Sequence, residues 1–177
     1  MFQKTVLFLL CLSVIFVMSP CTVFAEKITQ AVAVISPTAS SNVHGVVQFS
    51  AVPEGIKVHA TFSGLAPGKH GFHIHEFGDI SASNGSGVGG HFNPLKKEHN
   101  SPDATDRHCG DMGNVVADKE GFATLDYVDK SLSLNGENSI IGRGVIVHEK
   151  EDDFKTQPTG GAGNRIGQGT VGIAKAK

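Results

Sequence analysis

Short segments in which apolar and polar side chains alternate recur from residue 26 to the end of this chain, and no segment there has helical periodicity. In the clearest, from Ile56 to Phe62, every second residue is apolar. A strand has this period of two when one face is buried and the other meets water. Eight strands are predicted, at residues 28–35, 43–50, 56–62, 68–76, 114–118, 122–128, 140–149 and 170–175. The pattern predicts an all-β fold, an antiparallel sandwich or barrel.

Two intervals between these segments, residues 78–113 and 149–169, are too long for hairpin turns. The first is rich in Gly, Ser, Asn and Pro, and the second is charged at its start and rich in Gly at its end. Long loops in a compact domain are usually functional. Four of the nine histidines lie in these loops or at their edges: His91, His99, His108 and His148. We therefore expect one domain with two long functional loops.

The first 25 residues have the pattern of a secretory signal peptide. Lys4 provides a positive start, a mostly apolar run follows, and Ala25 suits a peptidase site. The apolar run is short for a membrane span. A retained anchor is the alternative, and lipoprotein processing at Cys21 is a weaker rival. We predict a signal peptide at 1–25 and one domain at 26–177, exported to a periplasm or the extracellular space and free of the membrane after cleavage.

The charge of the chain argues against a nucleic-acid-binding protein, and its cysteine content argues against a domain stabilised by internal disulfides. The chain has 15 Lys and Arg against 17 Asp and Glu, so it lacks the basic character of a nucleic-acid-binding protein. Cys11 and Cys21 leave with the predicted signal peptide, so the mature chain keeps only Cys109 and cannot form an internal disulfide. We expect Cys109 to be a buried apolar side chain. The alternatives are a disulfide between chains or a sulfur ligand to a misplaced metal.

Histidine spacing indicates bound metal. His73 and His75 are two residues apart on a predicted strand, so their rings point to the same face and can hold one ion. Imidazole suits copper and zinc, and a carboxylate completes a tetrahedral zinc site. His91, His99 and His108 of the first loop with Asp111 are suited to a closed zinc site. The strand pair with His148 leaves a more open site for a redox metal. The candidates are His73, His75, His91, His99, His108, Asp111 and His148.

Five motifs follow one another along the chain. They are GFHIHEFGD at 71–79, GHFNP at 90–94, RHCGDMGN at 107–114, VHEKEDD at 147–153, and GNR at 163–165 with GIA at 172–174. In sequence and order they resemble the signature of copper/zinc superoxide dismutases, over residues 31–174, and the eukaryotic-type branch more than the periplasmic bacterial one. The resemblance implies an eight-stranded antiparallel Greek-key β-barrel or sandwich, an architecture of which this family is itself a standard example. It also implies copper and zinc as cofactors and superoxide as the substrate, converted to dioxygen and hydrogen peroxide.

The resemblance assigns roles to the candidate residues. The copper ligands would be His73, His75, His91 and His148. The zinc ligands would be His91, His99, His108 and Asp111. His91 would bridge the two metals and carry a proton in the reaction, and Arg165 would attract and orient the anion beside copper. Asp152 would accept hydrogen bonds from His73 and His99 and so orient a ligand of each metal.

The chain departs from the family pattern at the first long loop. Relatives tie this loop to the barrel with a disulfide, but residues 79–90 contain no cysteine, and Gln168 stands where the partner cysteine would be. A disulfide of this kind typically contributes about 2–4 kcal/mol. We therefore expect the first loop to depend more on zinc for its order. The stretch between His148 and Arg165 is also short for the eukaryotic-type branch.

Two further questions follow from the resemblance. One alternative function is a non-enzymatic copper and zinc binder of the same fold, but degenerate relatives lose a copper ligand or the arginine, and this chain keeps them. A homodimer is expected, because residues 140–143 and 172–174 resemble segments at the eukaryotic-type dimer interface. The missing disulfide argues against it, because the tethered loop normally supports that interface. His70, just before the first motif, is expected to form hydrogen bonds without taking part in catalysis.

Overall fold

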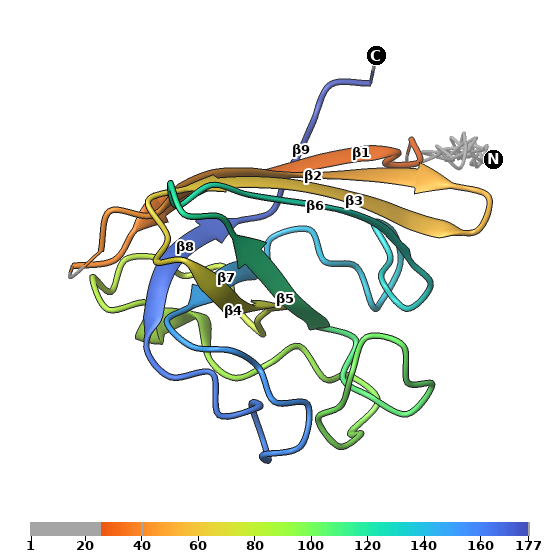
Figure 1. The fold of residues 1–177 in the computed structure, drawn as a ribbon. Coiled ribbons are helices and arrows are strands. Elements are labelled where there is room, and N and C mark those ends of the chain that lie inside the picture. The colour runs from red at the N-terminus through yellow and green to blue at the C-terminus, as the bar shows by residue number, and fades with distance from the viewer. Residues whose placement is uncertain (1–25, 40, 177) are drawn as a thin grey trace, which may run out of the picture.

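The fold of residues 26–39 and 41–176, the part of the chain that this computed structural model describes, consists of nine antiparallel strands (Figure 1). They are β1 (Gln30–Pro37), β2 (His44–Val52), β3 (Gly55–Ser63), β4 (Gly68–Ile74), β5 (Asp111–Ala117), β6 (Ala123–Asp129), β7 (Gly144–His148), β8 (Arg165–Thr170) and β9 (Gly172–Ile173). A short 3-10 helix, η1 (Ser86–Val88), lies in the first long loop. The predicted signal peptide at 1–25 lies outside the described residues. Within the described ranges, no helix has the length and hydropathy that crossing a bilayer requires.

The first eight strands form one sheet that nearly closes into a barrel, in the order β5-β4-β7-β8-β1-β2-β3-β6. The two-residue β9 pairs with β1. Neighbours such as β4 and β7, or β8 and β1, are not consecutive in the chain, which is a Greek-key arrangement. In the described chain β5 and β6 share no ladder, so the barrel stays open along that seam. The predicted all-β Greek-key barrel is confirmed.

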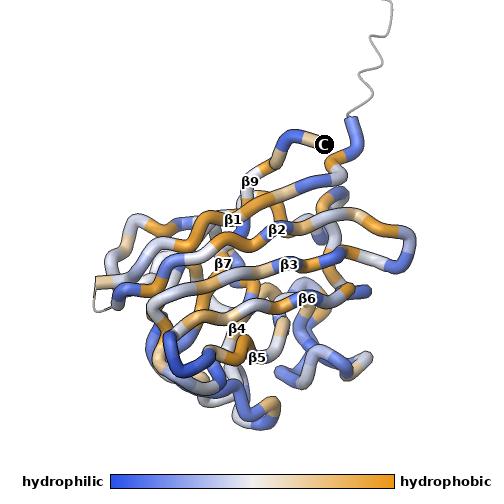
Figure 2. Tube along the Cα trace, turned by 45° about the horizontal axis from the view of Figure 1, so that its top comes forward, coloured by the Kyte–Doolittle hydropathy of each residue, from blue (hydrophilic) through white to orange (hydrophobic). Residues whose placement is uncertain are grey.

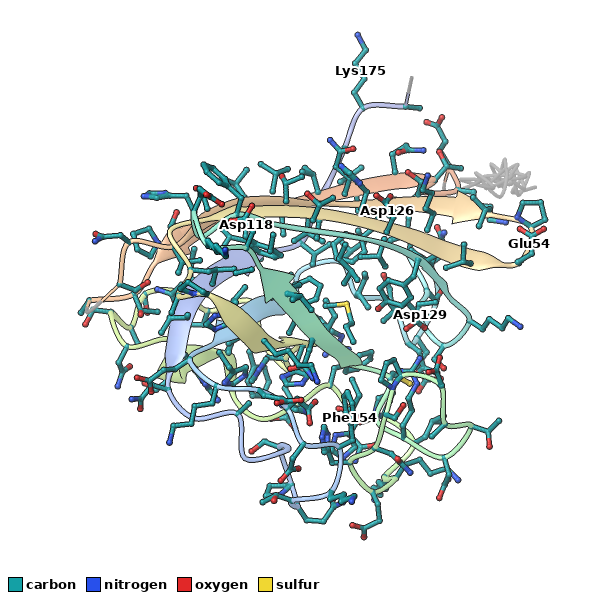
Figure 3. The ribbon with its side chains drawn as sticks, viewed as in Figure 1. Glu54, Asp118, Asp126, Asp129, Phe154 and Lys175 are labelled. Carbon is teal, nitrogen blue, oxygen red and sulfur yellow. The ribbon has the colours of Figure 1, made fainter. Side chains whose placement is uncertain are left out.

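The alternation in β3 decides which of its side chains enter the core. Ile56, Val58, Ala60 and Phe62 are buried, and the strand pairs with β2 on one side and β6 on the other. Figure 2 shows the same alternation of hydrophobic and hydrophilic residues along β2 and β3. Phe62 meets Phe72 of β4 edge to face, with ring centroids 5.4 Å apart, and so packs the two sides of the barrel together. The outward side chains meet solvent, as Asp126 on the outer layer does (Figure 3).

The last strands differ from the prediction for a physical reason. The sequence pattern predicts one strand at 170–175, whereas β8 covers Arg165–Thr170 and only two residues follow in β9. The sequence pattern does not predict β8, because the strand contains Gly167 and Gly169 and glycine is depleted in strands. Close approach to β1 requires them: a Cβ atom on Gly169 would lie 2.5 Å from the Val34 carbonyl oxygen. The second long loop therefore ends at residue 164.

Both long loops lie on the side of the molecule away from β1, β2 and β3 (Figure 1). Gln157 of the second loop binds both backbone groups of His99 in the first, at 2.8 Å each. Arg107 of the first loop forms a buried ion pair with Asp129 at the end of β6, with 2.8 Å between Nη2 and Oδ2. These contacts hold the two loops against each other and against the barrel.

Candidate metal centre

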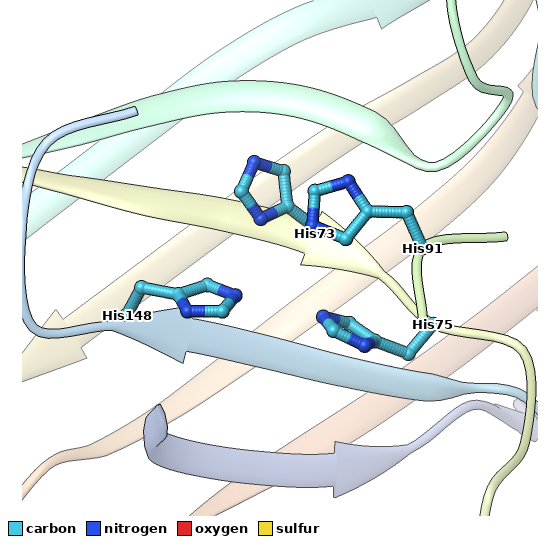
Figure 4. A group of neighbouring side chains, drawn as sticks. All are labelled: His73, His75, His91 and His148. Atoms are coloured by element: carbon cyan, nitrogen blue, oxygen red, sulfur yellow. The ribbon is translucent and has the colours of Figure 1, made fainter. Parts of the chain in front are cut away.

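Strand pairing brings together four histidines from distant parts of the chain. His73 lies in β4, His75 follows the strand, and His148 ends the neighbouring β7. His91 of the first loop joins them because it forms an antiparallel bridge with His75. All four are buried, and Figure 4 shows their rings around a common centre. The side chains that the sequence analysis placed on copper therefore form one group.

Buried nitrogens without partners mark the centre of this first group. They are His73 Nδ1, His75 Nε2, His91 Nε2 and His148 Nε2, and none has a hydrogen-bond partner among the residues that the structure describes. Each residue offers one ligand atom, and these atoms lie within 4.8 Å of one another. Buried polar atoms are nearly always hydrogen-bonded, so four unpartnered nitrogens around one point need another explanation. A cation at that point provides it, and an all-imidazole set suits copper.

The second ring nitrogen of these histidines is held by hydrogen bonds. His75 Nδ1 donates to the Gly89 carbonyl at 3.1 Å, and His148 Nδ1 donates to the Gly163 carbonyl at 3.2 Å. A neutral imidazole that donates from one nitrogen has a lone pair on the other. Each backbone carbonyl therefore selects the tautomer whose Nε2 can bind a metal.

Asp111, the first residue of β5, gathers the second group. Its Oδ1 lies 2.9, 3.0 and 3.1 Å from the Nδ1 atoms of His91, His99 and His108. Its Oδ2 accepts backbone N–H bonds from Asn100 and His108, which fixes the carboxylate. Three ring nitrogens and one carboxylate oxygen are the donor set of a closed tetrahedral zinc site. His91 belongs to both groups, with Nε2 in the first and Nδ1 in the second, as a bridging ring requires.

Asp152 of the second loop is fully buried and contacts one member of each group. Its Oδ2 lies 2.7 Å from His73 Nε2, and its Oδ1 lies 2.8 Å from His99 Nε2. Asn114 of β5 holds the Asp152 backbone by donating to its carbonyl and accepting from its N–H. Gly160 leaves room for the carboxylate, since a Cβ atom there would lie 1.9 Å from Asp152 Oδ1. Asp152 is thus positioned to orient both rings.

Burial controls the protonation of the first group. It lowers the pKa of His75 and His148 well below the ordinary value and, with the nearby His73, lowers the pKa of His91 to about 3. These rings are neutral at neutral pH, with lone pairs available. At His99, burial also acts to lower the pKa, but the hydrogen bonds to Asp111 and Asp152 outweigh it and raise the pKa to about 9. Without metal, His99 therefore carries a proton that a metal must displace.

Arg165, the first residue of β8, lies beside the first group. It pairs with His148 across the β7–β8 ladder. Its Nη2 donates to the Gly89 carbonyl at 2.6 Å, the same oxygen that accepts from His75, and its Nη1 donates to the Gly85 carbonyl. Arg165 is the one charged residue among those that line a cleft of about 520 Å³: Thr38, Asn84, Ser86, Gly89, Gly163, Asn164 and Arg165. A fixed guanidinium in such a cleft attracts and orients an anion.

Two residues outside the metal groups were expected to be structural, and they are. Both ring nitrogens of His70 lie against backbone carbonyl oxygens, of His148 at 2.9 Å and of Ala66 at 2.8 Å. Cys109 is free and buried within the hydrophobic core, as a small apolar residue would be.

The residues that hold the loops in place were not predicted from the sequence. Arg107 belongs to one of the motifs but was given no role, and no role was predicted for Asp129 or Gln157. Their contacts join residues 22 positions apart for the ion pair and 58 positions apart for Gln157 with His99, so no local pattern indicates them. The one feature of the sequence that could have indicated a structural role is the position of Asp129, directly after the predicted strand at 122–128.

Comparison with known proteins agrees with this geometry. A family model described as copper/zinc superoxide dismutase matches residues 43–171. Cu-Zn superoxide dismutase 5 of Dictyostelium discoideum is 46% identical over 125 residues, 67% of this chain and 81% of that protein. Cu-Zn superoxide dismutase 2 of Mesembryanthemum crystallinum is 44% identical, over 82% of this chain and 96% of that protein. The extracellular Cu-Zn superoxide dismutase of Caenorhabditis elegans is 38% identical, over 92% of this chain and 78% of that protein.

A solved structure agrees as well. The crystal structure of the clock protein EA4 matches with a TM-score of 0.78 at 40% sequence identity, covering 85% of this chain and 98% of that one. The chain therefore belongs to the copper/zinc superoxide dismutase family and is an oxidoreductase whose metals are copper and zinc.

Proposed function

We propose that this chain converts superoxide to dioxygen and hydrogen peroxide at a copper ion that shares one histidine with a zinc ion. The copper ligands are His73, His75, His91 and His148. The zinc ligands are His91, His99, His108 and Asp111. The observation that carries the proposal is the group of four buried, unpartnered ring nitrogens. When bound, copper supplies alternating reduction and oxidation, and zinc supplies a fixed charge without redox change.

Arg165 binds and orients the incoming anion. Two loop carbonyls, of Gly85 and Gly89, hold its guanidinium, so the positive charge is in place before the anion arrives. Such a preorganised charge costs no rearrangement when the anion binds. Burial lowers the pKa of Arg165, but arginine stays protonated in proteins.

His91 holds and returns one of the two protons. Its Nε2 would be the atom that binds copper and has no hydrogen-bond partner in the described structure, so a proton can take the place of the metal on that nitrogen as the first superoxide leaves as dioxygen. It gives that proton to the second superoxide, which takes another from water and leaves as hydrogen peroxide. Its Nδ1 stays against Asp111, so the ring keeps its orientation. Two superoxide anions and two protons thus give one dioxygen and one hydrogen peroxide.

The test is superoxide consumption by the protein loaded with copper and zinc, with a His148→Ala variant beside it. Fast consumption by the parent and nearly none by the variant supports the copper assignment. If the parent binds both metals and consumes superoxide no faster than buffer, the proposal fails, and the chain is a metal binder of the same fold.

We also propose that residues 1–25 direct export and that residues 26–177 form the domain. The Caenorhabditis elegans relative, described as extracellular, supports this. The first strand begins at Gln30, shortly after the predicted cleavage point. Mass spectrometry of the exported protein should find Glu26 at the N-terminus, and a chain that keeps Met1 would contradict the proposal.

A two-fold homodimer is the assembly that we propose. Support comes from three large apolar side chains that are exposed by 59%, 40% and 64%: Phe77, Ile80 and Ile173. Their segments adjoin, since Thr170, three residues before Ile173, donates to the carbonyl of Gly78, which lies between Phe77 and Ile80 in the chain. Exposed apolar side chains that lie on adjoining segments commonly mark protein interfaces.

Ile173→Glu tests the dimer by sedimentation. It should give a monomer, because it buries a charge in the proposed interface. Val116→Glu is the matched control, since Val116 is similarly exposed, at 60%, but lies on β5 at the open seam. A parent that sediments as a monomer contradicts the dimer, as does a dimer that survives Ile173→Glu.

A further inference from the structure

The side chains of β8 bind the first long loop at successive points. Thr170 Oγ1 donates to the Gly78 carbonyl at 2.7 Å. Gln168 Nε2 lies 3.3 Å from each of two carbonyl oxygens, those of Ile80 and Ala82. Arg165 donates to the two carbonyls farther along the loop, those of Gly85 and Gly89. Three donors on one strand thus bind the backbone of residues 78–89 in order, and Gln168 is the middle one.

A bulge in β8 places these three side chains on one face. Gln168 stands opposite Ile146 and Arg165 stands opposite His148, while Gly167 stands opposite Val147. One extra residue, Ile166, therefore separates the two ladder positions. Residues three apart on a regular strand point to opposite faces, and the extra residue brings them to the same face. The strand is built so that Gln168 and Arg165 meet the same loop.

The surroundings of Gln168 show what keeps its side chain in place. The residue is only 6% exposed, and its Oε1 has no hydrogen-bond partner within the described part of the chain. Its Nε2 bonds go only to the first loop in the described structure. A Cβ atom on Gly85 would lie 3.2 Å from Arg165 Cδ and 3.5 Å from Gln168 Oε1, so the loop closes on both side chains at that glycine. Gln168 and Arg165 therefore share one stretch of loop.

We infer that Gln168 is a positioning residue: its amide tethers residues 78–89 to β8 without a covalent bond and so fixes the carbonyls that hold the Arg165 guanidinium. The described residues contain a single cysteine, the free and buried Cys109, so the tether consists of hydrogen bonds alone. The loop is then held to the barrel independently of redox conditions. The effect on Arg165 rests on the anion-binding role proposed above, whereas the effect on the loop does not.

The test compares Gln168→Met with Gln48→Met, a control on the exposed face of β2. Methionine keeps the length of the side chain and removes the donor. On protein loaded with both metals, amide hydrogen exchange should become about tenfold faster in residues 79–89 of the Gln168 variant, as expected for loss of hydrogen bonds of ordinary strength. Exchange in the control should match the parent. If the methionine variant fails to fold, Gln168→Asn, whose amide is one methylene too short, replaces it.

The second readout is the affinity of azide, a small anion, followed through the copper absorption band. Gln168→Met should bind azide several-fold more weakly, with the copper content and the anion-free spectrum unchanged. Unchanged exchange in residues 79–89 would overturn the tether. Faster exchange with unchanged azide affinity would overturn the positioning of Arg165. The exchange result stands even if the protein consumes no superoxide, so failure of the tether and failure of the proposed function are distinguishable.

Discussion

The Asp152 carboxylate touches a member of each ligand group, so Asp152→Asn probes the whole centre with one change of atom. Its two oxygens lie 2.7 Å from His73 Nε2 and 2.8 Å from His99 Nε2. Asparagine has one acceptor oxygen, and its NH₂ group would face the second ring N–H donor to donor. One of the two rings therefore loses its partner. We expect it to be His99, because its loop can move more easily than β4, which holds His73.

The magnitude follows from the burial of these groups. A hydrogen bond to a charged group contributes about 1.5–3 kcal/mol, and each 1.4 kcal/mol is about a factor of ten in an equilibrium constant. Losing the partner that orients a ligand typically weakens metal binding by about 10- to 100-fold. We therefore expect the zinc affinity of Asp152→Asn to fall by about that factor.

Competition with a chromophoric chelator measures this affinity on the metal-free protein. Asp153→Asn is the matched control, since it makes the same change one residue along. Asp153 is exposed, and its carboxylate binds Lys155 and Thr156 of its own loop. The control should keep the affinity of the parent. Equal affinities for Asp152→Asn and the parent would refute the view that Asp152 orients the zinc ligand.

Three other perturbations have expected outcomes. Asp129→Asn should destabilise the zinc-loaded protein by about 3–5 kcal/mol, because it leaves the buried Arg107 without its charged partner; an unchanged urea midpoint would contradict this. Removing both metals should lower the melting temperature, since binding to the folded state stabilises it and no cysteine in residues 79–90 can tether the loop; equal melting temperatures count against it. Zinc uptake at neutral pH should release the proton that His99 holds with a pKa of about 9, which a pH indicator detects; uptake without release means that the ring was already neutral.

Local pattern was enough to predict most of the strands. Ile56–Phe62 alternates because β3 has one buried face, and the structure places β3 there. β8 could not be predicted in this way, because Gly167 and Gly169 are required by close approach to β1, a contact between distant parts of the chain. The alternation of apolar and polar residues indicates which face of a regular strand is buried. It does not indicate which strands pack closely against each other.

The same distinction, between local pattern and contacts of residues distant in the chain, applies to the candidate site. His73 and His75 are two apart on a strand, so their common face follows from the sequence. Metal chemistry indicated that the loop histidines and Asp111 suit a zinc site, whereas the bridging role of His91 and the role of Asp152 came from the resemblance to a family. The tether at Gln168 came from neither, because it depends on the extra residue at Ile166 and on loop carbonyls more than 80 positions away.

Copper titration of the zinc-loaded protein tests the central claim, that four unpartnered ring nitrogens form a catalytic copper site. Superoxide consumption is followed as copper is added in small steps. The account predicts a linear rise that stops at about one copper per chain, because the chain offers one such group within its described residues. No rise, or a rise that continues without a plateau as it does for free copper, would contradict it.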